Sequence, residues 1–105
     1  MVTSVSIQDL AEAKDRGDAI VDVREHHEYI SGHVPGATHV PMHTIPLHVD
    51  SFATGQPVYV LCESGARSWQ VAAFLERHGI PAVNVNGGTA AWRASGMPLE
   101  TGATA

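Results

Sequence analysis

Short apolar runs alternate with segments of helical periodicity along this chain, and this alternation restricts the fold more than any other feature. The apolar runs, each expected to form a strand, lie at residues 19–23, 38–40, 58–62 and 82–85. Helical patterns lie at residues 7–16, 26–30, 45–49, 68–78 and 89–94. Strands that alternate with helices form parallel sheets with right-handed crossovers. The sequence therefore predicts an α/β fold, a parallel sheet with helices on both faces.

Capping and turn residues mark the ends of several of these segments. Ser6 and Asp9 have the spacing of a helix cap, and Gly17 is placed to end the first helix. Gly87-Gly88 is expected to form a turn before the last helix. The helix at residues 45–49 is expected to be short, and a proline in its first turn is suited to begin it.

Length and composition suit one domain. A chain of 105 residues with 44% hydrophobic content can build one hydrophobic core and is too short for two. We therefore expect a single domain over residues 1–105, with its core at about residues 6–98 and a frayed C-terminal tail from Leu99 onward.

Charge and cysteine content restrict the partners and the compartment. The formal net charge is −5 and the six Lys and Arg residues form no cluster, which argues against nucleic acid or an anionic membrane surface as a partner. No stretch approaches the roughly eighteen apolar residues of a membrane span, and residues 1–10 lack the pattern of a targeting signal. One cysteine permits no internal disulfide, and a free thiol suits a reducing compartment. A cytoplasmic protein is expected.

The only cysteine, Cys62, lies where an apolar run meets a loop and then a helical pattern. A helix N-terminus offers unpaired N–H groups and a positive dipole end, which favour a thiolate over a thiol. A lone cysteine at the end of a buried strand is often only a small apolar side chain in the core. Here a glycine and an arginine follow within five positions, which packing alone does not require. A reactive thiol is therefore the favoured interpretation.

The loop after Cys62 is expected to form a cradle for an anion or a charged sulfur. Gly65 permits backbone angles that direct N–H groups inward, and Arg67 adds a permanent charge and a planar set of donors. Glu63 is the exception, because a carboxylate beside the Cys62 thiol should raise the pKa of the thiol and repel an anionic substrate. These effects are expected unless the Glu63 side chain points into solvent. The residues expected to bind substrate are Glu63, Ser64, Gly65, Ala66, Arg67 and Ser68.

A second strand delivers charged residues to the same edge of the predicted sheet. In parallel sheets the ligand site lies at the carboxyl ends of the strands, and the run at 19–23 ends in Asp22 and Arg24. We expect both residues to support the loop. Asp22 is expected to form a structural ion pair, whereas for Arg24 both support and substrate binding stay open.

Five motifs, in this order and spacing, resemble the rhodanese-like sulfurtransferases, and the likeness runs from about Ser6 to Pro98. The motifs are Asp22-Val23-Arg24-Glu25, Glu28-Tyr29, Gly32-His33-Val34-Pro35-Gly36-Ala37, residues 62–68, and Gly87-Gly88 with Trp92. The resemblance implies a five-stranded parallel sheet and an active-site Cys62 that becomes a persulfide. It also implies thiosulfate or a related sulfane-sulfur donor, and cyanide or a thiol, including a protein thiol, as the acceptor.

No metal, nucleotide or other cofactor is expected for this chemistry. Three histidines spaced by four and five positions suggest a metal only loosely, because two prolines interrupt any helix that would align them: His39, His43 and His48.

Two alternative functions are weighed against sulfur transfer. Cysteine phosphatases with a similar cradle have five residues between cysteine and arginine, whereas four separate Cys62 from Arg67 here, which leaves less room for a phosphoryl group. A regulatory binding module without activity would be expected to have lost the cysteine or the arginine, and this chain keeps both. A persulfide carrier would use the same residues as an enzyme and stays open.

Overall fold

The computed structural model describes residues 2–103 and contains a five-stranded sheet in the order β1-β5-β4-β2-β3. Every neighbouring pair of strands is parallel. The strands are β1 (Thr3–Val5), β2 (Ala19–Asp22), β3 (Thr38–His39), β4 (Val58–Leu61) and β5 (Ala82–Val85). This arrangement confirms the predicted α/β class and the parallel sheet.

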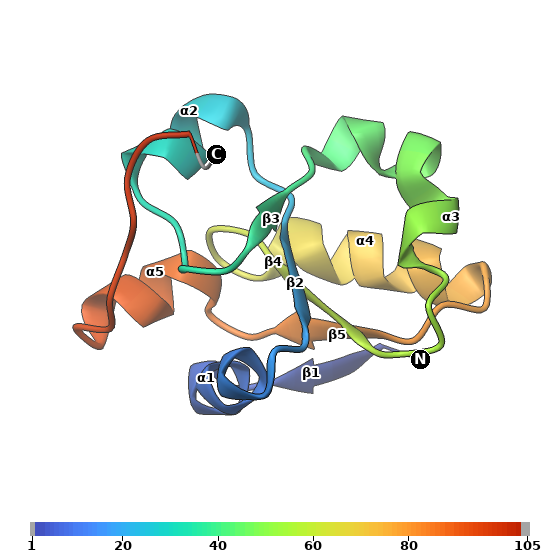
Figure 1. Cartoon of the computed structure of the whole chain (residues 1–105), viewed down its shortest axis with the longest axis horizontal. Helices are drawn as coiled ribbons and strands as arrows, with labels where there is room; N and C mark the ends of the chain where they lie inside the picture. Colours follow the sequence, from blue (N-terminus) through green and yellow to red (C-terminus); the bar gives the residue numbers. More distant parts are fainter. Residues whose placement is uncertain (1, 104–105) are drawn as a thin grey trace.

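Helices cover both faces of this sheet (Figure 1). One face packs against α1 (Ile7–Arg16) and α5 (Gly88–Ala94), and the other against α4 (Ala66–Arg77) with the 3-10 helix η1 (Met42–His48) and α3 (Val49–Phe52). The short helix α2 (His26–Ser31) follows β2. None of the helices within residues 2–103 is long and apolar enough to cross a membrane.

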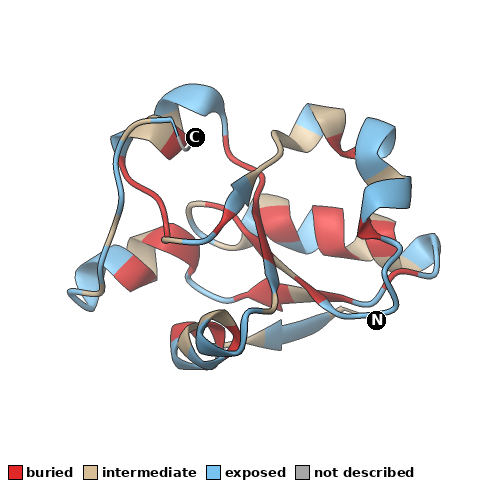
Figure 2. Cartoon of the chain, viewed as in Figure 1, coloured by how far each residue is buried: buried red, intermediate tan, exposed pale blue. Residues whose placement is uncertain are grey.

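Strand β4 shows why the core forms in two layers. Side chains alternate across a strand, so Val58 and Val60 enter the core beneath α4, whereas Leu61 enters the core beneath α1 and α5. All three residues are nearly inaccessible to solvent, and Figure 2 shows buried residues concentrated along the central strands and the helix faces turned toward them. The well-packed centre of the sheet therefore fixes the position of the residues that directly follow β4.

Most predicted elements are present, with three differences. Strand β1 is additional to the four runs expected. Helix α4 begins at Ala66, two residues before the predicted start, because Gly65 caps it. Residues 45–48 lie inside η1, a 3-10 helix that begins at Met42 and contains Pro46, and Val49 is the first residue of α3. The predicted cap of α1 is confirmed, since the Ser6 hydroxyl accepts from the Asp9 amide at 3.1 Å.

The C-terminal segment is held in place through residue 102, in contrast to the expected fraying. It forms an antiparallel bridge in which the His33 amide donates to the Glu100 carbonyl at 2.8 Å and the Glu100 amide donates back at 2.9 Å. The Gly102 amide also donates to the Ile30 carbonyl at 2.8 Å, and the segment runs up to α2 in Figure 1. The last two residues of that tail lie outside the described residues.

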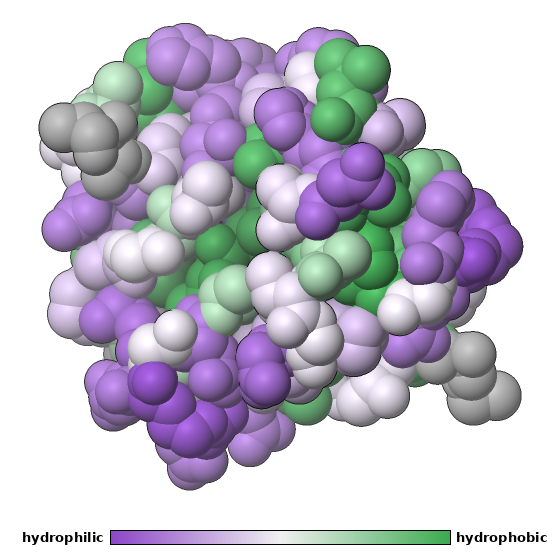
Figure 3. Space-filling view, turned by 45° about the vertical axis from the view of Figure 1, so that its right-hand side comes forward, coloured by the Kyte–Doolittle hydropathy of each residue, from purple (hydrophilic) through white to green (hydrophobic). Residues whose placement is uncertain are grey.

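One side of the molecule leaves apolar side chains accessible. In Figure 3 hydrophobic residues gather near the middle of the face, with hydrophilic residues around them. Leu47 of η1 and Trp69 of α4 are the large hydrophobic residues most open to solvent among those described, with 83% and 48% of their surface exposed. Isolated apolar side chains of this kind are common on protein surfaces.

Candidate active site

Cys62 directly follows β4, the middle strand of the sheet, at its carboxyl end. The chain then turns through Gly65, whose φ of +104° is strained for any residue with a side chain. A Cβ at Gly65 would also lie 3.3 Å from the Val85 carbonyl oxygen. Glycine therefore allows the loop to turn tightly from the strand into α4.

Donors from the loop converge on the Cys62 sulfur. The Gly65 amide lies 3.1 Å from Sγ and the Ser68 hydroxyl oxygen lies 3.2 Å from it. Burial raises the pKa of the Cys62 thiol, but hydrogen bonding from the Ser68 hydroxyl and from the amides of Ser68, Gly65 and Ser64 outweighs burial and places the pKa below its ordinary value. Ala66 and Arg67 provide further first-turn amides of α4. These donors favour the thiolate over the thiol.

Helix α5 holds this loop from outside. The Thr89 amide donates to the Cys62 carbonyl at 2.9 Å, and the Ala90 amide donates to the Glu63 carbonyl at the same distance. Gly88 permits this approach, because a Cβ there would lie 2.5 Å from the Cys62 carbonyl oxygen. The sequence predicts a turn at Gly87-Gly88, and the structure adds that Gly88 lies against the backbone of Cys62.

Asp22 and Arg24 form a buried ion pair behind the loop, as expected for Asp22. The Arg24 Nη2 lies 2.8 Å from an Asp22 carboxylate oxygen, and the same nitrogen donates to the Gly32 carbonyl at 2.8 Å. The other terminal guanidinium nitrogen, Nη1, lies 3.0 Å from a carboxylate oxygen of Glu63. With 1% of its surface exposed, Arg24 bridges three parts of the chain. This geometry favours support of the loop over contact with substrate.

The Glu63 carboxylate lies between two guanidinium groups and does not point freely into solvent. One oxygen is 3.0 Å from Arg24 and the other is 2.9 Å from Arg93 of α5. The two positive groups compensate the negative charge that the sequence placed beside the thiol. Arg93 was not expected at this site, and no local pattern marks it, because it lies 30 residues from Glu63.

Arg67 lies at the edge of the loop and is held by Glu28 of α2. Two parallel hydrogen bonds join the guanidinium to the carboxylate, at 2.8 and 2.9 Å. This contact raises the pKa of Arg67 and lowers the pKa of Glu28 to about 2. Arg67 keeps a favourable charge interaction with Cys62. The predicted anion-binding residue is therefore near the thiol, but its charge is already paired.

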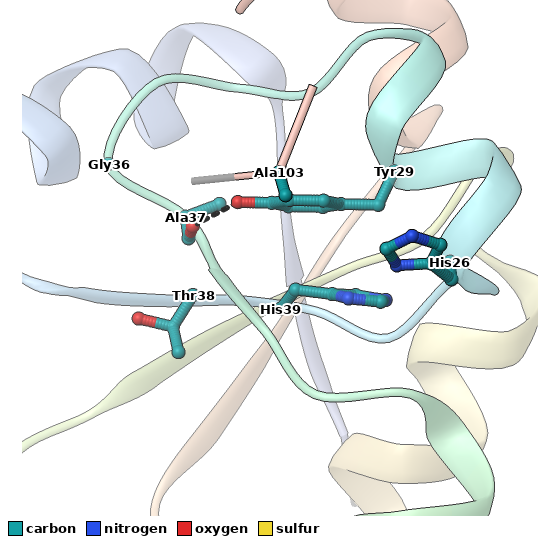
Figure 4. Close-up of a pocket in the computed structure, with 7 residues that line it drawn as sticks. All are labelled: His26, Tyr29, Gly36, Ala37, Thr38, His39 and Ala103. Atoms are coloured by element: carbon teal, nitrogen blue, oxygen red, sulfur yellow. Dashed lines mark hydrogen bonds between the residues drawn. The ribbon is translucent and has the colours of Figure 1, made fainter. Parts of the chain in front are cut away.

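A pocket of about 430 Å³ is lined by α2, by residues 36–39 and by Ala103, and its lining contains none of the loop residues from Cys62 to Ser68. Figure 4 shows the rings of Tyr29 and His39 face to face in its wall, with centroids 4.4 Å apart. Tyr29 donates to the Ala37 carbonyl at 3.1 Å, and His39 Nε2 bonds the Arg24 carbonyl at 2.7 Å. Within residues 2–103, no group of three or more His, Cys, Asp or Glu side chains is placed to hold a metal ion.

Comparisons with known proteins agree with the motif order and the fold. The model of the rhodanese-like domain family matches residues 6–95. A sulfurtransferase of Allochromatium vinosum is 38% identical over 93 residues, which are 88% of this chain and 85% of that protein. The thiosulfate sulfurtransferase GlpE of Actinobacillus pleuropneumoniae is 33% identical over 89 residues, 84% of this chain and 82% of that protein.

Solved structures show the same likeness. The crystal structure of a rhodanese-like domain protein from Staphylococcus aureus superposes with a TM-score of 0.85 at 37% identity, and the match covers 97% of this chain and all of that one. The family match covers most of the chain. The two relatives are named as sulfurtransferases, and the match covers most of the length of each. The protein therefore belongs to the rhodanese-like domain family.

Proposed function

We propose that this protein moves sulfane sulfur from thiosulfate or a related donor to cyanide or a thiol acceptor, through a persulfide on Cys62. The observation that supports this proposal is the convergence of the Gly65 amide and the Ser68 hydroxyl on the Cys62 sulfur, at 3.1 and 3.2 Å. These contacts, with the other loop amides, lower the pKa of the thiol. A larger thiolate fraction makes a better nucleophile at neutral pH.

The transfer takes two displacement steps that balance without an external oxidant. In the first step the Cys62 thiolate attacks the outer sulfur of thiosulfate, a new S–S bond forms, and sulfite leaves with the electron pair of the broken bond. In the second step the acceptor attacks the outer sulfur of the persulfide, and the Cys62 thiolate leaves. Cyanide becomes thiocyanate, and a thiolate acceptor becomes a persulfide. The covalent intermediate divides one difficult transfer into two easier ones.

The residues around the loop have separate parts in this proposal. The first-turn amides of α4, from Ala66, Arg67 and Ser68, together with those of Glu63, Ser64 and Gly65, bind the anionic donor and the outer persulfide sulfur. Arg67 contributes positive charge at the edge of the loop. Asp22 and Arg24 hold the loop from behind. Charge pairing of Glu63 with two arginines removes much of the repulsion that it would exert on thiosulfate.

Intact-mass measurement after incubation with thiosulfate tests the intermediate. We expect a gain of about 32 Da, the mass of one sulfur atom held covalently on the enzyme, and we expect cyanide to remove it with formation of thiocyanate. Cys62→Ser is the control and should show neither the adduct nor turnover. An adduct on the serine variant, or turnover without Cys62, would contradict the mechanism.

Steady-state kinetics separate an enzyme from a persulfide carrier that uses the same residues. An enzyme should give repeated thiocyanate formation, with parallel double-reciprocal lines when both substrates are varied, because the first product leaves before the acceptor binds. A single equivalent of sulfur that is loaded and then not turned over would instead support the carrier.

A further inference from the structure

Hydrogen bonds lead from the Cys62 sulfur through the buried side chains of Ser68 and Asn84 to the edge strand β1. Ser68 Oγ lies 3.2 Å from Cys62 Sγ and 2.6 Å from Asn84 Oδ1. Asn84 Nδ2 in turn lies 3.3 Å from the hydroxyl oxygen of Ser4. Ser68 and Asn84 are buried, with 0% and 2% of their surface exposed, whereas Ser4 is on the exposed edge strand β1. The position of Asn84 in the middle of β5, facing Ser4 and Val60, fixes its place in this series of hydrogen bonds.

The Ser68 hydroxyl lies beside two hydrogen-bond acceptors, Cys62 Sγ and Asn84 Oδ1, but has only one proton to donate. When Cys62 is a thiol, one arrangement satisfies every group: the S–H donates to Ser68 Oγ, and the Ser68 O–H donates to Asn84 Oδ1. The short distance of 2.6 Å between these oxygens agrees with this arrangement. When Cys62 is a thiolate, the sulfur can only accept, so the Ser68 hydroxyl must turn toward it.

That turn leaves two oxygen atoms facing each other unless Asn84 also changes. With the Ser68 proton directed at sulfur, a lone pair of Ser68 Oγ faces Asn84 Oδ1, and both are buried acceptors. Rotation of the side-chain amide by about half a turn presents Nδ2 to Ser68 as a donor. Asn84 Oδ1 then faces the Ser4 hydroxyl, which can reverse its role and donate. Asparagine satisfies both arrangements because its amide carries a donor and an acceptor.

We propose that Asn84 is a positioning residue that acts through Ser68, with its amide oxygen toward Ser68 in the thiol form of Cys62 and its amide nitrogen toward Ser68 in the thiolate form. The proposal deepens the sulfur-transfer function, on which its catalytic meaning rests. The thiolate is the nucleophile of the first displacement and the leaving group of the second, so the donated Ser68 proton stabilises it in both. The proton lost from the thiol goes to solvent, and the hydrogen-bonded groups only reorient.

Other charged groups around the loop form ion pairs, and none of these residues is substituted in the variants below. They come from β2, α2, the loop itself, α4 and α5, and form the pairs Asp22–Arg24, Arg24–Glu63, Glu63–Arg93 and Glu28–Arg67. The Asn84 side chain forms no hydrogen bond with any of these groups, since its side-chain hydrogen bonds within residues 2–103 are those to Ser68 and Ser4. An effect of Asn84 on the sulfur should therefore pass through Ser68.

Two substitutions at Asn84 should shift the pKa of the Cys62 thiol in opposite directions. Asn84→Asp supplies only acceptors when it is ionised and holds the Ser68 proton away from the sulfur, so the rate of Cys62 alkylation by iodoacetamide at a pH below the midpoint should fall about tenfold, which corresponds to a rise of one unit in the pKa of the thiol. Asn84→Leu removes the competing acceptor, so alkylation at a pH below the midpoint should become faster. Asn86→Asp, two residues along and exposed, adds the same charge without the hydrogen bond and should change the rate less.

A double-mutant cycle separates this role from a structural one. In a Ser68→Ala background, Asn84→Leu should no longer change the pH midpoint of alkylation, because the hydroxyl that links the two residues is gone. An equal shift with and without Ser68, or no shift in either Asn84 variant, would overturn the proposal. Circular dichroism checks that each variant is folded.

A measurement on the unmodified protein keeps the proposal testable if the buried substitutions prevent folding. The side-chain amide resonances of Asn84, identified by their loss in Asn84→Leu or by selective labelling, should change with pH at the same midpoint as Cys62 alkylation. They should be constant in Cys62→Ser. Amide signals that do not respond to ionisation of the thiol would refute the reorientation. Neither readout needs sulfur transfer, so failure of the proposed function and failure of this inference are distinguishable.

Discussion

Replacing Glu28 with glutamine tests what the ion pair between α2 and the edge of the active-site loop contributes to stability. Glu28 holds Arg67 through two hydrogen bonds of 2.8 and 2.9 Å, and its Oε1 also accepts from the Glu25 amide at 3.0 Å, at the start of α2. Glutamine keeps an amide oxygen for the Glu25 contact but loses the charge. The substitution therefore removes the ion pair and leaves the helix cap in place.

The magnitude follows from the lowered pKa of Glu28. Its pKa falls from the ordinary 4.5 to about 2, which corresponds to an upper limit of about 3.4 kcal/mol. The Glu28 side chain is 23% exposed and that of Arg67 is 37% exposed, so solvent screening reduces this value. We expect Glu28→Gln to lower the free energy of unfolding at pH 7 by about 1–2 kcal/mol, above a simple surface pair because of the bidentate geometry.

Urea unfolding across pH checks both the size and the sign of the effect. A carboxylate whose pKa is lowered by folding stabilises the protein above its unfolded pKa and loses this contribution as the pH falls through its folded pKa. The difference between wild type and Glu28→Gln should therefore be full above about pH 5 and shrink between pH 4.5 and about 2. Asp18→Asn, which removes the exposed Arg16–Asp18 pair, is the control and should have a smaller effect. Equal stability of Glu28→Gln and wild type at pH 7, or a difference independent of pH, would refute the reasoning.

Two further substitutions test contacts of the loop itself. Gly88→Ala should lower the free energy of unfolding by about 2 kcal/mol or more and reduce the thiolate fraction of Cys62, because the new Cβ would lie 2.5 Å from the Cys62 carbonyl oxygen. Thermal unfolding measures the first effect and the alkylation rate of Cys62 measures the second. A variant that is unchanged in both would show that α5 does not fix the loop. Arg67→Ala should chiefly raise the Michaelis constant for thiosulfate, by about tenfold for the loss of one charged contact, whereas an unchanged constant would remove Arg67 from donor binding.

The position of Cys62 between a strand and a helix could be predicted because its sequence signals are local. An apolar run, a glycine and a helical pattern follow one another within a few residues of Cys62, and strand, turn and helix form from neighbouring residues. The alternation of strands and helices likewise determined the parallel sheet, since connection rules leave few arrangements. Strand β1 carries no such signal, because Thr3 and Ser4 are exposed and the strand is held by its pairing with β5.

The partners of the loop side chains could not be predicted, because they are distant in sequence. Glu28 lies 39 residues from Arg67, and Asn84 lies 16 residues from Ser68. Periodicity says which face of an element a residue occupies but not which side chain of another element meets it. The position of Cys62 at the end of a strand could therefore be predicted, whereas the groups that pair with the charged residues around it and hydrogen-bond to its sulfur required the structure.

The contacts from α5 to the loop have a consequence for the protein during its synthesis. The ribosome makes Cys62 before the Thr89 and Ala90 amides that hold the carbonyls of Cys62 and Glu63. A domain completes its fold only after its later segments have emerged. Until α5 docks, these two contacts cannot hold the loop whose donors lower the pKa of Cys62. We therefore expect the nascent thiol to have the pKa of an ordinary cysteine until the last helix is in place.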